Sequence, residues 1–250
     1  MFSLQGKTAM ITGASGGLGE QFARTLSTAG ARVILVSRRI NKLESLRDEL
    51  GNAVAMQMDV SQKQSVKSCF VELEQAGEKI DICINNAGIA ALTPIFEEDN
   101  QEEFESIIQT NLLGVWYVIK AVANQMKHHH LHGAIINIGS VNEDMFSYKE
   151  VTAYAVSKAA VMPRTKSLAT EFPKRQSRIN TINPGPVQSD LLGSPNKHDA
   201  DFWKDKIPAV FMAYPSDLDG MLLYLASNQA SRYVTGVAFT IDGGLSCRSS

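Results

Sequence analysis

The sequence predicts an α/β fold, a doubly wound parallel sheet with helices on both faces, in one domain of residues 1–250. Seven short apolar segments alternate along the chain with longer segments whose apolar residues recur at the helical period. The short segments are apolar on both faces, as is typical of parallel strands covered by helices on both sides. Because crossovers between parallel strands are right-handed, this alternation favours a doubly wound sheet.

The expected strands are the short apolar segments Thr8–Thr12, Arg32–Val36, Ala53–Met58, Ile80–Ile84, Ala134–Ile138, Arg178–Ile182 and Val237–Ile241. The expected helices lie between them at Gly17–Ala29, Ile40–Leu50, Gln62–Ala76, Gln101–Met126, Thr152–Glu171 and Ser216–Ala226. Pro163 falls inside one of these helices, where proline removes a hydrogen bond and clashes with the carbonyl of Ala159. We therefore expect a kink over residues 159–163.

Composition argues against several classes of partner. The 24 basic and 26 acidic residues give a net charge of −2, which does not favour nucleic acid or an anionic membrane. Cys69, Cys83 and Cys247 are odd in number and lack metal-binding spacing, which indicates free thiols in a reducing compartment. The first residues lack a signal-peptide pattern, and no run approaches the roughly 18 apolar residues of a spanning helix. The expected location is the cytoplasm.

Small, polar and turn-forming residues follow six of the strands, at the edge where doubly wound folds bind ligands. These loops contain, in chain order, Gly13–Gly19, Ser37–Arg39, Asp59 and Val60, Asn85–Gly88, Gly139 and Ser140, and Asn183–Gly185. Strand ends need turns in any case, which accounts for each loop taken alone. It accounts less well for glycines, basic residues and hydroxyls sharing one edge.

The loop after the first strand carries Gly13, Gly17 and Gly19, with Ser15 and Leu18 between them, and it opens a helix. Glycine allows a tight turn and close approach of the backbone, and the start of a helix favours a pyrophosphate. This pattern predicts a Rossmann-type dinucleotide site. A tight strand-to-helix turn with no ligand is the alternative.

The residues after the second strand, Ser37, Arg38 and Arg39, include no acid. Sites that prefer NADP place arginine here for the 2′-phosphate, whereas sites that prefer NAD place an acid. The sequence therefore predicts NADP(H) as the preferred cofactor, with NAD(H) possible. Alternatively, both arginines belong to a solvated helix start.

Tyr154 and Lys158 are four residues apart in an expected helix, so their side chains share one face. A nearby ammonium favours tyrosinate, and we expect it to lower the pKa of the tyrosine from about 10. Ser140 could hydrogen-bond a substrate oxygen, although a lone serine more often forms a turn. Asn111 interrupts an apolar helical stripe, and its buried amide needs partners, whether structural or catalytic.

With these residues in view, the chain resembles the short-chain dehydrogenase/reductase family over essentially its whole length. The matching motifs are Thr12-Gly13-x-x-x-Gly17-x-Gly19, Asp59, Asn85–Gly88, Asn111, Ser140, Tyr154-x-x-x-Lys158, Pro184-Gly185 and Asp242–Gly244. The resemblance implies a seven-stranded parallel sheet, a carbonyl or secondary-alcohol substrate and a nicotinamide cofactor. It also implies a homo-oligomer, a dimer or tetramer.

The resemblance further implies a role for each matching residue. Tyr154 is the acid or base, Ser140 positions the reacting oxygen, Lys158 lowers the tyrosine pKa and holds a ribose, and Asn111 supports a water relay. Cofactor contacts are implied along the whole loop edge: Asp59 and Val60 at the adenine, Asn86, Ala87 and Gly88 at the ribose, and Pro184, Gly185, Val187 and Ser189 at the nicotinamide.

Four residues or intervals depart from the family pattern. Ser140 and Tyr154 are separated by 14 residues, more often 13 in the family, so we expect the loop Val141–Val151 to bulge and the serine to shift slightly. Gly16 stands where many NADP-preferring relatives carry a basic residue, and Ser189 replaces a threonine. Pro163, followed by Arg164, lies in a helix that often forms a subunit interface, which makes the tetramer less certain.

Two remaining segments bear on ligands. Pro186–Tyr214 is long for a loop in a compact domain, and we interpret it as a lid over cofactor and substrate, or else as an ordinary packed excursion. The four histidines His128, His129, His130 and His132 have no acid or cysteine nearby in the sequence, so we expect no metal site. The leading activity is a carbonyl reductase, such as a 3-oxoacyl thioester reductase. The alternatives are a sugar, steroid or other alcohol dehydrogenase, or a non-catalytic NADP(H) sensor.

Overall fold

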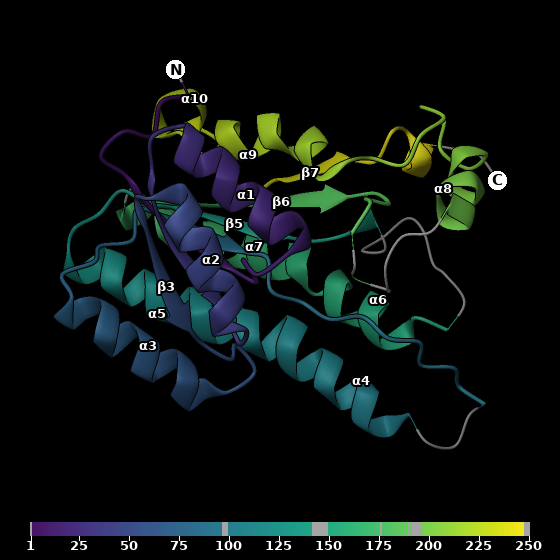
Figure 1. Ribbon diagram of the computed structural model, residues 1–250, viewed down its shortest axis with the longest axis horizontal. Helices are drawn as coiled ribbons and strands as arrows, with labels where there is room; N and C mark the ends of the chain where they lie inside the picture. The colour runs from purple at the N-terminus through teal and green to yellow at the C-terminus, as the bar shows by residue number, and fades with distance from the viewer. Residues whose placement is uncertain are drawn as a thin grey trace.

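The computed structural model describes residues 2–96, 100–141, 150–175, 177–189, 191 and 197–247. Within these ranges, seven parallel strands form one sheet in the order β3-β2-β1-β4-β5-β6-β7 (Figure 1). The strands are β1 Thr8–Thr12, β2 Arg32–Ser37, β3 Ala53–Gln57, β4 Ile82–Asn85, β5 Ala134–Ile138, β6 Arg178–Pro184 and β7 Ala238–Ile241. The doubly wound α/β fold expected from the sequence is confirmed, and the strand order reverses between β1 and β4.

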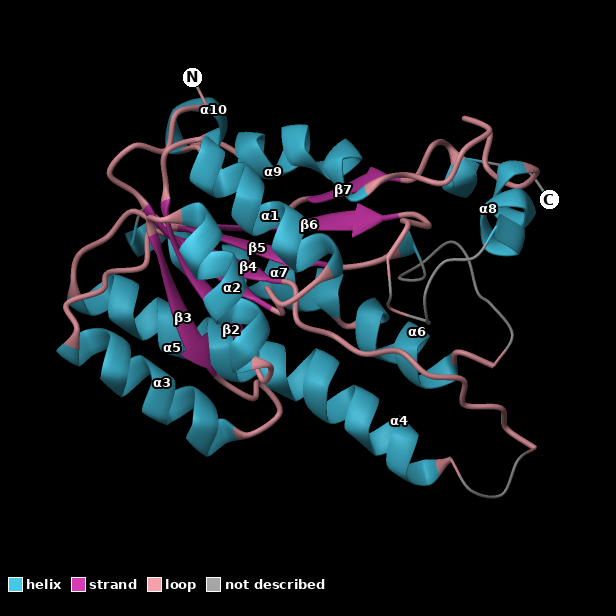
Figure 2. Cartoon of the chain, in the orientation of Figure 1, coloured by secondary structure: helices cyan, strands magenta, loops and turns pink. Residues whose placement is uncertain are grey.

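Helices cover both faces of the sheet (Figure 2). One face packs against α1 (Gly17–Thr28), α2 (Ile40–Leu50) and α9 (Asp219–Ala226). The other packs against α3 (Lys63–Gln75), α5 (Val115–His128) and α7 (Val161–Ala169). The remaining helical segments are α4 Gln101–Ile108, α6 Thr152–Ala159, α8 Lys197–Lys204, α10 Asn228–Ser231, η1 Gln109–Gly114, η3 Phe172–Arg175, η4 Pro215–Leu218 and η5 Leu245–Cys247.

The strands are apolar on both faces because each face has its own core. In β1, Ala9 and Ile11 belong to the core beneath α1 and α2, whereas Met10 belongs to the core beneath α3 and α5. Successive side chains of a strand point to opposite faces, so a strand between two helix layers needs apolar residues at every position. This is the physical origin of the continuous apolar segments in the sequence.

The helix expected at Gln101–Met126 is interrupted by a π-helical segment. Regular helix ends at Ile108, residues 109–114 are π-helical, and α5 continues from Val115 to His128. The whole helix is long and apolar enough to cross a membrane by length and composition alone. Its buried side chains, among them Val118 and Val122, form part of the core, which accounts for its apolar character.

The helix is interrupted beside Pro163, within the residues where the kink is expected. The helix stops at Ala159 and restarts at Val161 as α7, with Ala160 between the two segments. Pro163 therefore lies in the first turn of α7, where a backbone N–H has no acceptor within that helix and its absence costs little. Arg164 folds back onto its own chain and donates from Nη1 to the carbonyl of Leu112 at 3.2 Å.

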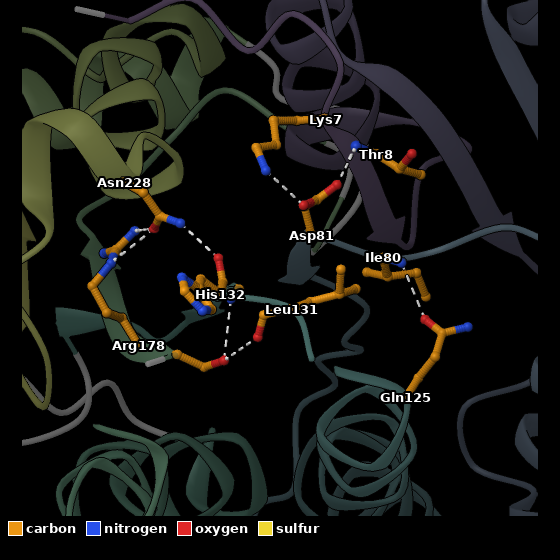
Figure 3. A network of polar contacts seen from close by, with 11 residues as sticks. Lys7, Thr8, Ile80, Asp81, Gln125, Leu131, His132, Arg178 and Asn228 are labelled. Carbon is orange, nitrogen blue, oxygen red and sulfur yellow. Dashed lines mark hydrogen bonds and ion pairs between the residues drawn. The ribbon is translucent and has the colours of Figure 1, made fainter. Parts of the chain in front are cut away.

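The amino ends of the strands are tied to one another by polar side chains (Figure 3). Asp81, before β4, accepts from Lys7 Nζ at 2.8 Å and thereby reaches the loop before β1. Asn228 accepts from Arg178 Nη2 at 2.8 Å and donates to the carbonyl of His132 at 2.6 Å. These contacts tie together the loops that precede the strands at the amino edge of the sheet.

Candidate active site

The carboxyl edge of the sheet contains a cleft of about 830 Å³. Loops that follow β1, β2, β3, β4, β5 and β6 line it, together with one face of α6. The sequence-predicted residues that line the cleft are Gly13, Ser15, Gly17, Leu18, Ser37, Arg38, Arg39, Asp59, Val60, Asn86, Ala87, Gly88, Ser140, Tyr154, Lys158, Pro184, Gly185, Val187 and Ser189. The two other predicted residues, Gly19 and Asn111, pack behind its wall. Loops far apart in the sequence thus meet at one cleft.

The glycine loop is shaped by close backbone contacts. A Cβ on Gly13, whose φ is +71°, would lie 2.9 Å from Asn86 Nδ2 and 3.0 Å from Ala87 Cα. A Cβ on Gly19 would lie 2.2 Å from the carbonyl oxygen of Gly13. Gly16 precedes α1 and has no side chain to cap the N–H groups of its first turn. The loop and helix start therefore form a cradle that fits a pyrophosphate.

Thr12, which is fully buried, joins the loops after β1 and β4 at the reversal of strand order. Its hydroxyl accepts from the backbone N–H groups of Asn86 at 3.1 Å and Ala87 at 3.0 Å. The Asn86 amide donates in turn to the carbonyl of Thr12 at 3.0 Å. These bonds fix the spacing of the two loops that flank the switch point, where doubly wound folds bind their ligands.

Arg39 lies across the glycine loop. It donates to Ser15 Oγ from Nε at 3.0 Å and from Nη2 at 2.8 Å. Its Nη2 also lies 3.5 Å from the position that a Cβ on Gly16 would occupy. The guanidinium of Arg39 therefore occupies the space beside residue 16, where relatives often carry a basic side chain. Lys42, in the first turn of α2, adds a further cation to the same wall. No sequence motif pointed to this lysine.

Ser140, Tyr154 and Lys158 meet at the end of β5. The side chains of Ser140 and Tyr154 are hydrogen-bonded. Lys158 is buried, its Nζ lies 5.6 Å from the centre of the Tyr154 ring, and it donates to the carbonyl of Ile138 at 2.8 Å. The serine is therefore in contact with the tyrosine in spite of the 14-residue interval. The expected bulge falls on residues 142–149, which lie outside the described residues.

The pKa of Tyr154 differs in direction from the sequence-based expectation. Burial raises it above its ordinary value, and the hydrogen bond with Ser140 offsets part of that rise. The lowering expected from Lys158 is not found. Its ammonium donates to the carbonyl of Ile138 and lies 5.6 Å from the centre of the tyrosine ring.

Asn111 lies in the π-helical segment and is fully buried. Its amide accepts from the N–H of Ile89 and donates to the carbonyl of Ile89, both at 2.9 Å. It also donates to Ser157 Oγ at 3.0 Å, and that hydroxyl donates to the Tyr154 carbonyl at 2.7 Å. The structural reading of Asn111 is thus confirmed: it fixes α6, and with it Tyr154, against the loop after β4. Insertion of a residue into a helix is a common way to aim a side chain at a functional site.

An apolar part of the wall completes the cleft. It consists of Leu92, Val141, Val151, Leu191, Trp203 and Met212, which come from loops and from α8. The long segment 186–214 begins and ends beside the cleft, since Val187 pairs with Ala213 in a parallel bridge and Gln188 N donates to the Ala213 carbonyl at 2.9 Å. Residues 190 and 192–196 of the expected lid lie outside the described residues.

Pro184–Ser189 reaches across the cleft toward the glycine loop. Ser189 Cβ lies 3.6 Å from the position that a Cβ on Gly17 would occupy. Gly185 packs against Asp242, since a Cβ there would lie 2.8 Å from Asp242 Cα, and the Asp242 carboxylate accepts from Gly244 N at 2.9 Å. The motif Asp242–Gly244 therefore supports the loop after β6 from outside the cleft.

Comparison with known proteins decides the family. The family model described as enoyl-(acyl carrier protein) reductase matches residues 13–246. Oxidoreductase UcpA of Salmonella typhimurium is 37% identical, with 98% of this chain and 96% of that protein aligned. The crystal structure of a short-chain type dehydrogenase/reductase from Mycobacterium marinum superposes with a TM-score of 0.92 at 36% identity, covering 99% of this chain and 98% of that one.

This chain is a short-chain dehydrogenase/reductase. It is accordingly an oxidoreductase that acts on CH–OH and C=O groups with a nicotinamide cofactor. Solved members of the family differ in substrate and cofactor. A gluconate 5-dehydrogenase of Burkholderia cenocepacia in complex with NADP and tartrate is 31% identical (TM-score 0.91, 99% of this chain and 98% of that one). A 3-ketoacyl-(acyl-carrier-protein) reductase of Brucella melitensis with NADH is 32% identical (TM-score 0.88, 98% and 100%).

Proposed function

We propose that this short-chain dehydrogenase/reductase interconverts a ketone and a secondary alcohol with NADP(H), on a substrate with an apolar part such as a 3-oxoacyl thioester. The observation that carries the proposal is the hydrogen-bonded pair Ser140–Tyr154 beside buried Lys158, in the same cleft as the glycine loop. A tyrosine hydroxyl held in this way can give a proton to a carbonyl oxygen or take one from an alcohol.

The bound cofactor supplies or accepts the hydride, and the chain positions the reactants and moves the proton. In reduction, Tyr154 protonates the oxygen as the carbonyl π bond breaks, and Ser140 holds that oxygen by a hydrogen bond. The ammonium of Lys158, 5.6 Å from the ring, stabilises the tyrosinate that remains. Asn111 acts as a positioning residue, because its amide holds the loop after β4 and the Ser157 hydroxyl of α6.

The cofactor would lie along the loop edge, with its pyrophosphate at Gly13, Gly17 and the start of α1. The adenine end would lie by Asp59 and Val60, and the ribose by Asn86–Gly88. The nicotinamide end would lie by Pro184–Val187 and Ser189. The fit rests on the glycines, whose missing side chains leave room for close approach of a phosphate to the backbone.

Preference for NADP(H) rests on the basic wall after β2. Arg39, Arg38 and Lys42 line the cleft beside the glycine loop, and a guanidinium matches the geometry of a phosphate. Asp59 lines the cleft as well, but its carboxylate accepts from Ser61 N at 2.9 Å and Ser61 Oγ at 2.7 Å within its own turn. A higher affinity for NADPH than for NADH is the expected result, and equal or tighter NADH binding would reject this preference.

Preference for a partly apolar substrate rests on the wall beyond Tyr154. Val151, Trp203 and Met212 are among its apolar side chains, and the described residues there include no cation suited to a sugar-acid carboxylate. The segment 186–214 would act as the lid that closes this end over the substrate. These features favour an acyl thioester or a steroid over a polyol.

The decisive experiment is NADPH oxidation with a short 3-oxoacyl thioester, a steroid ketone and a ketosugar acid, repeated with NADH. Turnover with NADPH on the apolar ketones that falls by about 10²–10⁴-fold in Tyr154→Phe, with cofactor binding retained, is the expected result. Turnover confined to the sugar acid would reject the apolar substrate. Binding of NADPH without turnover on a wide panel of ketones and alcohols would instead indicate a non-catalytic sensor.

A further inference from the structure

The four histidines at the end of α5 and just beyond it, His128, His129, His130 and His132, do not line the cleft and are not part of the hydrophobic core. The sequence offered no acid near them, but the fold brings one from α3. Glu74 lies in the last turn of α3, and one ligand atom from each of Glu74, His128 and His129 lies within 4.8 Å of the others. The acid comes from 55 residues away in the chain, so the sequence pattern could not show it.

The geometry points to a binding site for a divalent transition-metal ion, Zn²⁺ or a similar ion, formed by Glu74, His128 and His129. Two imidazole nitrogens and a carboxylate oxygen are ligands that Zn²⁺ commonly takes, with a fourth position left for water. Hard cations such as Mg²⁺ and Ca²⁺ prefer all-oxygen sites, so this donor set selects against them.

The distances between donor atoms are near those that a single ion requires. His129 Nε2 lies 2.8 Å from Glu74 Oε1, and His128 Nε2 lies 4.0 Å from the same oxygen. Two ligands of a tetrahedral ion with bonds of about 2.0–2.1 Å are about 3.3 Å apart, a value between these two distances. His128 is 74% exposed, so its ring can turn without disturbing the core.

The end of α5 makes this arrangement possible. His128 is the last residue of the helix and His129 is its C-cap, where the backbone leaves helical geometry. The two rings therefore meet edge to face, with centroids 4.7 Å apart, instead of diverging as neighbours in a helix would. The carboxyl ends of α3 and α5 converge here, and their dipoles favour a cation.

Gln125, which is not one of the three ligands, holds the carboxylate of Glu74 in place. Gln125 is buried and donates to Glu74 Oε2 at 3.4 Å. Its amide oxygen accepts from the backbone N–H of Ile80 at 3.1 Å (Figure 3). Such outer partners orient metal ligands and raise their affinity. In the metal-free protein His129 Nε2 and Glu74 Oε1 are hydrogen-bonded to each other, and an ion bound between them takes the place of this bond.

The proposed metal site and the cleft lie at opposite edges of the sheet, so an ion should affect stability and not the reaction. The metal site lies where α3 and α5 end, at the amino edge of the sheet, whereas the cleft lies at the carboxyl edge. A bound ion would join two helices that pack on the same face of the sheet, α3 and α5 (Figure 1). It should raise thermal stability and leave hydride transfer unchanged.

The test is titration of the full chain, prepared without a polyhistidine tag, with Zn²⁺ alone and then Co²⁺ alone. Calorimetry should give one site per chain, and Co²⁺ should give visible absorption. Glu74→Gln and His129→Asn should each weaken binding at least about tenfold, the loss caused even by removal of an outer partner. His132→Asn is the matched control, because it removes a histidine outside the cluster, and it should bind as the wild type does.

Three results would overturn the site. No stoichiometric Zn²⁺ binding would do so at once. Equal weakening by His132→Asn and His129→Asn would show a diffuse histidine patch instead of a three-residue site. Binding that is unchanged in Glu74→Gln would remove the carboxylate from the ligand set. The unfolding temperature of each variant without metal shows whether it is folded, and Zn²⁺ should raise that temperature only in the wild type and His132→Asn.

Discussion

Polar residues gather at both the amino edge and the carboxyl edge of the sheet, but they serve a different purpose at each edge. At the amino edge, Asp81 accepts from Lys7, and Asn228 joins Arg178 to the His132 carbonyl, so these polar side chains tie the loops together (Figure 3). At the carboxyl edge, glycines allow the backbones of the loops to approach one another closely, and side chains such as Tyr154 line the cleft. Stability and chemistry are thus assigned to different edges, and substitutions should separate them.

The largest effect is expected at Gly19, a tightly packed position of the carboxyl edge. Gly19→Ala places a Cβ 2.2 Å from the carbonyl oxygen of Gly13, so α1 must move away from the glycine loop. We expect a loss of about 1–3 kcal/mol in unfolding free energy, the usual cost of overpacking, together with loss of NADPH binding. Urea unfolding and fluorescence titration with NADPH measure the two effects.

Gly220→Ala is the matched control for this substitution. Gly220 lies in α9 and a Cβ there meets no atom within 4 Å, so alanine should be neutral or stabilise the helix by up to about 1 kcal/mol. Its NADPH affinity should equal that of the wild type. If Gly19→Ala keeps full NADPH affinity, the glycine loop is not the cofactor cradle, whatever the change in stability.

The second-largest effect is expected from a substitution at the amino edge. Arg178 is buried, and burial lowers the pKa of its guanidinium to about 10, so the cation depends on its acceptors. Asn228→Ala removes an acceptor from Arg178 and a donor from the His132 carbonyl. We expect a loss of about 1–3 kcal/mol, with the unfolding temperature falling by about 2–4 °C for each kcal/mol.

The affinity for NADPH should not change in Asn228→Ala, because the edge it alters is remote from the cleft. Asn124→Ala, on the exposed face of α5, is the control, with an expected change in stability within about 0.5 kcal/mol. A fall in NADPH affinity in Asn228→Ala at unchanged stability would show that the two edges are coupled, contrary to the comparison.

The contrast between the edges also explains what the sequence could predict. Strand and helix positions follow from apolar periodicity, so most expected boundaries lie within one or two residues of those found. The loop residues of the cleft were predictable because they follow strands and match family motifs. Apolar periodicity is a local property of each segment, and the loop motifs are shared by the family.

Contacts that depend on tertiary packing were not predictable. The π-helical insertion at residues 109–114 leaves no mark in the apolar stripe except Asn111 itself. Glu74 meets the histidines only because α3 and α5 end side by side, and the raised pKa of Tyr154 comes from burial that no spacing encodes.

The smallest expected effect, a shift in one titration, tests the electrostatics of the carboxyl edge directly. Burial favours the neutral phenol, so Tyr154 in the cofactor-free enzyme should ionise above the ordinary tyrosine pKa of about 10. Ultraviolet difference titration of the wild type against Tyr154→Phe isolates this one phenol. Since the folded-state pKa is raised, the stability that it contributes is fully present below about pH 10 and is lost as pH rises through the folded pKa.

Ser140→Ala sharpens this result. The hydrogen bond from Ser140 offsets part of the rise, so its removal should move the Tyr154 titration to still higher pH. An ionisation well below pH 10 in the wild type would mean that Lys158, and not burial, dominates the free enzyme, as the sequence alone suggested. In that case the tyrosine would be poised for proton abstraction before any ligand binds.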